Sequence, residues 1–132
     1  MNIPYENEIV RDAFGQWISG LFGAVCGWNP NVRFTEQKEL FFSLLENLLD
    51  DGRAMLIAPG ADCYISTDNP NPKLTIEDPD VHWKAPVAEI MRFVRDGWPS
   101  GANDMNDLEL TYYFYELPGL IWVTEDGKLV AS

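Results

Sequence analysis

Apolar residues recur in adjacent pairs four positions apart in two stretches of the chain, and this spacing constrains the fold more than any other feature. Such pairs fall on one side of an α-helix, because the helix has about 3.6 residues per turn. The first stretch predicts a single helix from about Glu8 to Val25 with Asn7 as its N-cap. The second predicts a helix through residues 40–49, with Thr35 as its N-cap and Gly52 as its stop. We expect the two apolar faces to pack together.

The pattern changes after Gly52, where a short apolar run ends at Pro59 and predicts a buried strand. Residues 60–80 are rich in proline and carboxylates and predict a meandering hairpin, with candidate strands at residues 63–67 and 73–77. A third amphipathic helix is then indicated by the apolar face Val87, Ile90, Met91 and Val94. Pro86 suits its first turn and Gly97 its stop.

The last thirty residues contain one ambiguous segment and one clear one. Residues 106–117 alternate well enough for a strand, but Asp104 or Asn106 followed by Leu108, Tyr112 and Tyr115 also fits a short capped helix, which we favour. Two apolar runs then flank Glu125-Asp126-Gly127, and Asp-Gly between such runs predicts a β-hairpin. The chain is therefore expected to be one α+β domain, residues 1–132, with about three main helices on a small, mostly antiparallel sheet that ends in a C-terminal hairpin.

This fold predicts which side chains form the core. We expect burial of Leu44, Leu45, Leu48, Ile90, Ile121 and Val123, and core positions for Trp17, Phe41 and Trp122. Two cysteines, Cys26 and Cys63, are too few for a disulfide framework and are expected to be buried free thiols.

Charge indicates the class of partner. Nine Lys and Arg against 21 Asp and Glu give a formal net charge of −12, which repels nucleic acid and anionic membranes and attracts cationic proteins. The alternative is that the acidity only maintains solubility. The first residues carry acids where a secretory signal would carry lysines, and the apolar window 13–28 is too interrupted to span a bilayer. We expect a cytoplasmic protein that binds neither nucleic acid nor membranes.

Sequence motifs for catalysis are weak. Pro79-Asp80 and Asp126-Gly127-Lys128 match the PD…(D/E)xK nuclease pattern. The predicted hairpin turn already explains Asp126 and Gly127, and the negative net charge of the chain would repel a nucleic-acid substrate. His82 has no nucleophile motif beside it, and no calcium loop can be written. The Gly23/Gly27 spacing is more typical of close helix packing or a frayed helix end. We therefore expect no catalytic residues, no metal and no cofactor.

Acidic and aromatic residues form the expected partner-binding surface, because aromatic side chains anchor interfaces and carboxylates steer a basic partner. One acidic cluster comprises Asp62, Asp68, Glu77, Asp78 and Asp80, and the other comprises Asp104, Asp107 and Glu109. Trp83 and Tyr113 are the candidate aromatic anchors, whereas Trp98 and Tyr115 are assigned neither to the core nor to the surface.

The sequences "RFVRDGWP" and "NDMNDLELTYYFYELPGLIWVTEDGKLVAS" resemble a small bacterial family, formerly of unknown function, found among immunity proteins of polymorphic toxin and contact-dependent inhibition systems. The resemblance covers mainly residues 86–132. It implies a cytoplasmic protein that blocks a toxin delivered by a neighbouring cell, often by masking the active site of a basic nuclease domain. It carries over no catalytic residue. The alternatives are a structural or adaptor protein that self-associates, for example as a homodimer, and a metal-dependent hydrolase.

Overall fold

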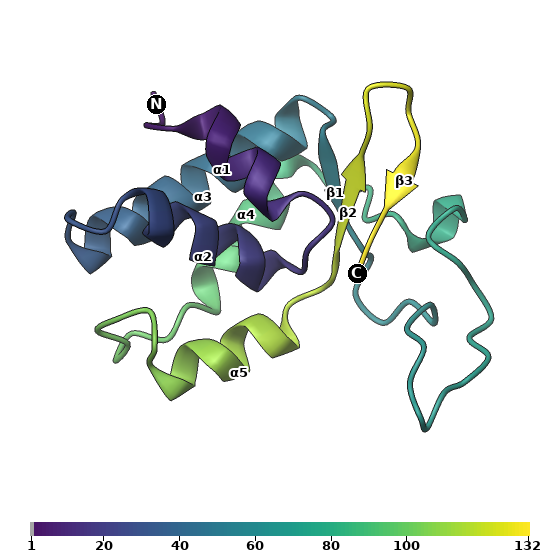
Figure 1. Cartoon of the computed structure of the whole chain (residues 1–132). Helices are drawn as coiled ribbons and strands as arrows, with labels where there is room; N and C mark the ends of the chain where they lie inside the picture. The colour runs from purple at the N-terminus through teal and green to yellow at the C-terminus, as the bar shows by residue number, and fades with distance from the viewer. Residues whose placement is uncertain (1) are drawn as a thin grey trace.

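The computed structural model describes residues 2–132 and has an α+β fold, as the sequence predicts. Five α-helices lie to one side of a small antiparallel sheet, and a long loop extends from the far side (Figure 1). The helices are α1 (Glu6–Ala13), α2 (Ile18–Trp28), α3 (Phe34–Asp50), α4 (Val87–Asp96) and α5 (Leu108–Glu116). The strands are β1 (Ala54–Leu56), β2 (Leu120–Val123) and β3 (Leu129–Val130), and Pro79–Val81 forms one 3-10 turn.

The first predicted helix is in fact two, because the chain turns between Ala13 and Ile18. Gly15 has φ +82°, a left-handed conformation that a glycine adopts without steric cost. The apolar pairs keep their spacing across this turn, so periodicity alone did not reveal the break. The prediction of Asn7 as N-cap is also wrong, since α1 begins at Glu6 after Tyr5.

The helix α3 carries the centre of the core and packs against α2 as expected. It ends just before Gly52, whose φ of +72° confirms the predicted stop. Its N-cap is Arg33, so Thr35 lies inside the first turn and the predicted cap is wrong. The expected burial of Leu44, Leu45, Leu48, Ile90, Ile121, Phe41 and Trp122 is confirmed.

The sheet has the order β1-β2-β3, and both faces of its central strand are covered. Ala54 pairs with Trp122 in β1–β2, and Trp122 pairs with Val130 in the predicted C-terminal hairpin, where Gly127 has φ +86°. Leu120 and Trp122 face the helical core, whereas Ile121 joins a second, smaller cluster with Ile57 and Val81. Val123 is only half-buried, contrary to prediction, because it lies at the end of the strand.

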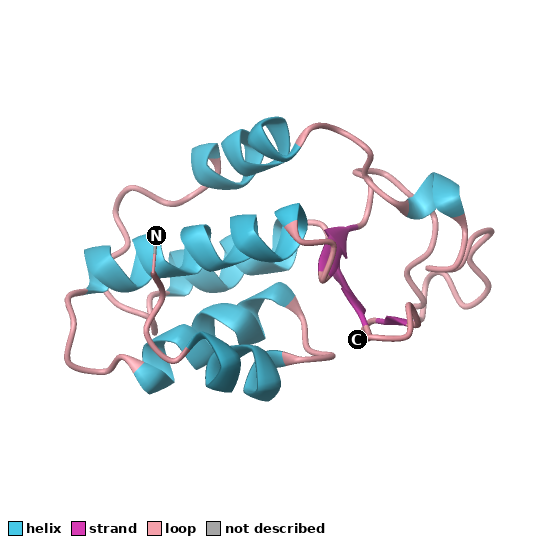
Figure 2. Ribbon diagram, turned by 90° about the horizontal axis from the view of Figure 1, so that it is seen from above, coloured by secondary structure: helices cyan, strands magenta, loops and turns pink. Residues whose placement is uncertain are grey.

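Residues 60–78 form an ordered loop, and the strands predicted at residues 63–67 and 73–77 are absent there. Prolines at 70, 72 and 79 cannot donate to a ladder. The backbone is joined locally instead: Leu74 N donates to Asp62 O at 2.9 Å, and Ser66 and Asn69 exchange two hydrogen bonds. Seen from above, this loop lies on the side of the sheet away from the helices (Figure 2).

The helix α4 has the predicted face and ends at Gly97, although Pro86 is its N-cap and does not belong to its first turn. The structure confirms that residues 108–116 are helical. The N-cap of α5 is Asp107, not Asp104 or Asn106. Its apolar face was wrongly assigned: Leu110, Tyr113 and Phe114 are buried, whereas Leu108, Tyr112 and Tyr115 are exposed.

Three smaller expectations about packing are corrected. Cys26 is buried, and burial raises the pKa of its thiol to about 11, but Cys63 is only half-buried. A Cβ on Gly23 or Gly27 would meet no atom within 4 Å, so this glycine pair does not mark close helix packing. Trp17 is half-buried and not part of the innermost core. Across residues 2–132 we find no helix that combines the length and the apolar character needed to cross a membrane.

Candidate functional site

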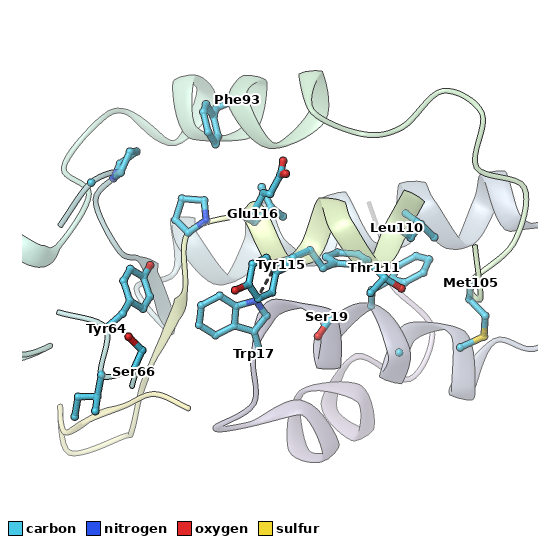
Figure 3. Close-up of a pocket in the computed structure, with 18 residues that line it drawn as sticks. Trp17, Ser19, Tyr64, Ser66, Phe93, Met105, Leu110, Thr111, Tyr115 and Glu116 are labelled. Atoms are coloured by element: carbon cyan, nitrogen blue, oxygen red, sulfur yellow. Dashed lines mark hydrogen bonds between the residues drawn. The ribbon is translucent and has the colours of Figure 1, made fainter. Parts of the chain in front are cut away.

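A groove of about 960 Å³ follows α5 in the described chain. Figure 3 shows α5 between α2 and α4, with Tyr64 and Ser66 at one end of the groove and Met105 toward the other. The lining comes from α2 and the preceding Trp17, α4, α5 and the preceding Met105, the loop residues 59–60 and 64–66, and the residues that lead into β2. Sequence segments far apart in the chain therefore build a single surface.

The turn between α1 and α2 places Trp17 in the wall of this groove. Its indole Nε1 donates to the carbonyl oxygen of Phe114 at 3.0 Å, which ties the start of α2 to the end of α5 (Figure 3). The ring of Tyr64 lies 6.1 Å from that of Trp17, tilted by 56°. The Tyr64 hydroxyl accepts a hydrogen bond from Gly119 N at 2.9 Å, and burial raises the pKa of this phenol. The wall is thus fixed by polar bonds to the backbone.

Gly119 makes this close approach feasible. A Cβ at this position would lie 2.9 Å from both Ile57 Cδ1 and Trp17 Cζ3, closer than real side chains come. A larger residue here would therefore have to displace Ile57 or Trp17, where the groove wall, the sheet and the loop meet.

Several large apolar side chains in the lining are exposed. The large apolar residues that both line the groove and stand exposed are Tyr64, Ile65, Phe93, Met105 and Tyr115. Tyr115 and Ile65 are 83% and 79% exposed, respectively. Large apolar side chains gathered on one concave surface are characteristic of interaction sites.

The charge in the groove is negative only. Among the described lining residues Glu116 is the only one with a charged side chain, and neither lysine nor arginine is present. Glu116 is exposed, and no cation lies within 4.0 Å of it in the described part of the chain. The groove therefore offers apolar surface and a single carboxylate.

The first predicted acidic cluster is divided between structural and free carboxylates. Asp62 accepts hydrogen bonds from Asn69 Nδ2 at 2.8 Å and from Lys73 N at 3.2 Å, and these bonds lower the pKa of its carboxyl. It therefore holds the loop together. Asp68, Glu77 and Asp80 are exposed on the same loop, and Asp78 is half-buried.

The second cluster lies around the start of α5 and is also partly structural. Asp107 accepts from Glu109 N at 3.0 Å as the N-cap, and Asp104 accepts from Asn106 N at 2.8 Å in the preceding turn. Only Glu109 has an exposed carboxylate for which the described chain shows no hydrogen bond. Substituting Asp62 or Asp107 would therefore disturb local structure.

Neither predicted aromatic anchor is a free surface residue. Tyr113 is buried, and its hydroxyl donates to the carbonyl oxygen of Val94 at 2.6 Å, so it joins α5 to the last turn of α4. Trp83 is half-buried and meets Phe93 edge-on at 5.2 Å. Trp98 lies among core aromatic rings, whereas Tyr115 is at the surface.

In the second half of the nuclease-like pattern, Asp126 and the backbone of Lys128 take part in the hairpin turn. Thr124 Oγ1 donates to Asp126 Oδ1, which lowers the pKa of that carboxyl, and Lys128 N donates to Thr124 Oγ1 at 2.9 Å within the hairpin turn. The imidazole Nε2 of His82 faces the carbonyl oxygen of Ile76 at 2.7 Å, and since a carbonyl only accepts, this nitrogen carries the proton. Within residues 2–132, no group of three or more His, Cys, Asp or Glu side chains is arranged to hold a metal ion.

The sequence interpretation missed most of the groove, namely Phe93, Tyr64, Ile65, Met105 and Glu116. One signal was present: Leu108, Tyr112 and Tyr115 are apolar residues on the side of α5 opposite Leu110, Tyr113 and Phe114. A short helix that is apolar on opposite sides cannot bury both against one core. That conflict could have indicated a second contact surface.

Comparisons with known proteins inform the fold alone. No protein-family model matches the chain, and no curated protein matches its sequence. A solved structure described as an uncharacterized protein conserved in bacteria, from Neisseria meningitidis, is similar in fold, with a TM-score of 0.61 at 20% sequence identity. The likeness covers 95% of this chain and 84% of the other chain.

Proposed function

We propose that this chain is a cytoplasmic immunity protein, which binds a basic, nuclease-like toxin domain and neutralises it by covering its active site. The observation that carries the proposal is the groove along α5, where exposed aromatic side chains and one carboxylate stand together on a chain of net charge −12. Exposed aromatic residues supply the anchors of an interface, and a negative surface accelerates encounter with a cationic protein. Inhibition of this kind needs a complementary surface and no catalytic group.

Free carboxylates on the long loop add a second element to this proposal. Asp68, Glu77 and Asp80 are exposed on a segment that lies beyond the sheet. Charges at the rim of an interface mainly change the association rate and its salt dependence. The groove would then provide anchoring contacts and the loop would provide steering.

Self-association is the second candidate, because Leu108, Tyr112 and Tyr115 form an exposed apolar stripe on α5. Such a stripe could pair with that of a second copy. The net charge of −12 on each copy opposes this pairing. Sedimentation velocity at low and high salt separates the two candidates: a basic-partner binder stays monomeric at both, whereas a self-associating protein dimerises more readily in high salt.

The main test uses the gene beside this one, which the proposal expects to encode a protein with a basic toxin domain. Cells producing that domain should survive when this chain is co-produced, and the purified proteins should form a complex whose affinity falls steeply with salt. Changing Asp68, Glu77 and Asp80 together to Asn, Gln and Asn should slow association and flatten the salt dependence. The same kind of change at Glu36 and Glu46, exposed on α3, is the control. Failure of the wild-type chain to bind and protect would reject the immunity assignment.

A further inference from the structure

We propose that the groove along α5 receives an arginine side chain from a basic segment of the partner, with its guanidinium paired to Glu116 and its stem lying against Phe93. This inference rests on the proposed function, because it specifies how the same surface recognises a cationic protein. Figure 3 shows the two side chains projecting from α5 and α4 into the space between those helices. They present a carboxylate and an aromatic ring to one site.

The position of Glu116 gives an independent reason for a functional role. It is the last residue of α5, where the partial negative charge of the helix terminus disfavours an anion. No cation of the described chain lies within 4.0 Å to compensate. A carboxylate at an electrostatically unfavourable helix terminus is expected where function requires it. A guanidinium from outside would satisfy both the side chain and the nearby helix terminus.

The apolar lining favours arginine over other cationic groups. Arginine stacks its planar guanidinium on aromatic rings, pairs with carboxylates through two parallel hydrogen bonds and is less strongly hydrated than an ammonium. Phe93 is about half exposed, and its ring meets that of Trp83 in an edge-to-face arrangement, so part of the Phe93 side chain is open to a ligand. The described lining contains neither lysine nor arginine, so no cationic side chain of the groove pairs with the Glu116 carboxylate.

The direct test uses two hexapeptides, Ac-Gly-Gly-Arg-Leu-Gly-Gly-NH2 and its citrulline counterpart, in which a neutral urea replaces the guanidinium; each is titrated into the isotope-labelled chain. The arginine peptide should shift the resonances of Glu116, Tyr115 and Phe93, and it should bind at least about fivefold more tightly than the citrulline peptide. Equal shifts with both peptides, or shifts confined to Asp68, Glu77 and Asp80 outside the groove, would overturn the proposal.

Matched substitutions on α5 locate the effect. Glu116→Gln should weaken the arginine peptide by about tenfold and leave the citrulline peptide unchanged, whereas Glu109→Gln, seven residues earlier on the same helix, should change neither. Tyr115→Ala, in the groove lining, should weaken both peptides, and Tyr112→Ala, exposed outside that lining, should not. Glu116→Gln should not lower the melting temperature, since it removes an unfavourable charge, so lost binding cannot be attributed to unfolding.

The toxin domain separates this inference from the proposed function. If the toxin binds the wild type but Glu116→Gln leaves its affinity unchanged, the arginine site is wrong and immunity stands. If the arginine peptide behaves as expected but the toxin neither binds nor is neutralised, the site stands and the immunity assignment fails. If groove substitutions abolish dimerisation of this chain with itself, the occupant is a second copy and the inference is overturned.

Discussion

The two sides of the sheet are stabilised in different ways. On the helical side, Trp122, Phe41 and Phe22 belong to a large hydrophobic cluster that includes residues from all five helices. On the loop side, the described buried apolar residues are only Ile57, Val81 and Ile121, flanked by half-buried neighbours. Two hydrogen bonds that the Asp62 carboxylate accepts within the loop, and one from His82 to the carbonyl oxygen of Ile76, supplement this small cluster. The comparison teaches that one region depends on apolar burial and the other on a few polar contacts.

The largest difference should appear when one apolar side chain is removed from each region. Trp122→Ala should lower the free energy of unfolding by about 3–5 kcal/mol, because Trp122 is fully buried and its indole donates to Gln16 O at 3.0 Å. Ile76→Ala, among the half-buried neighbours of the loop cluster, should cost about 1 kcal/mol or less. Urea unfolding followed by circular dichroism measures both. Equal costs would erase the distinction between the two regions.

A single hydroxyl tests a polar contact inside the helical region. Tyr113→Phe should cost about 1–2 kcal/mol, because the carbonyl oxygen of Val94 at the end of α4 loses its buried donor. Burial also raises the pKa of the Tyr113 phenol, so its contribution is complete below about pH 10 and is lost as pH rises toward the folded-state pKa. Spectrophotometric titration should show one tyrosine that ionises last. Tyr112→Phe, exposed on the same helix, should leave stability unchanged.

The smallest effect should come from the loop, and it should be local. Asp62→Ala should speed amide exchange at Lys73 and Leu74 while the global unfolding transition barely moves, because the carboxylate joins two parts of one loop. Asp68→Ala, exposed on the same loop, is the control. Since hydrogen bonds from Asn69 and Lys73 lower the pKa of Asp62, the loop should be fully ordered above about pH 4 and loosen as pH falls through the lowered value.

That pH dependence can be followed at the Asn69 side-chain amide by NMR. A titration midpoint at or above the ordinary aspartate pKa would contradict the assigned role of Asp62. Uniform loosening of α3 together with the loop would show that the two regions unfold as one unit.

The same contrast explains what the sequence could predict. Buried residues recur at regular spacing in helices and strands. Helices α3 and α4, strands β1 and β2 and the Asp-Gly hairpin could therefore be predicted from apolar periodicity and turn residues. Loop geometry depends on particular side-chain contacts, such as Asp62 with Asn69, which have no periodic signature. The break at Gly15 was missed because apolar spacing continued through it and only the backbone angle differs.

The candidate site was less predictable than the fold because residues far apart in the chain form it. Trp17, Tyr64, Phe93 and Glu116 meet only after the helices and the loop have packed. Each has a plausible local interpretation as a core or surface residue when taken alone. Acidity could be counted in advance, but which carboxylates were committed to backbone hydrogen bonds, as in Asp62 and Asp107, required coordinates.

The bond from Trp17 to the Phe114 carbonyl also gives the groove a built-in optical probe. The chain has five tryptophans, and among the described groove-lining residues Trp17 is the only one. Replacing the other four with phenylalanine where the core tolerates it, or comparing the wild type with Trp17→Phe, would isolate its emission. A ligand that displaces water from this indole should shift that emission to shorter wavelength, so occupancy of the groove could be followed without any attached dye.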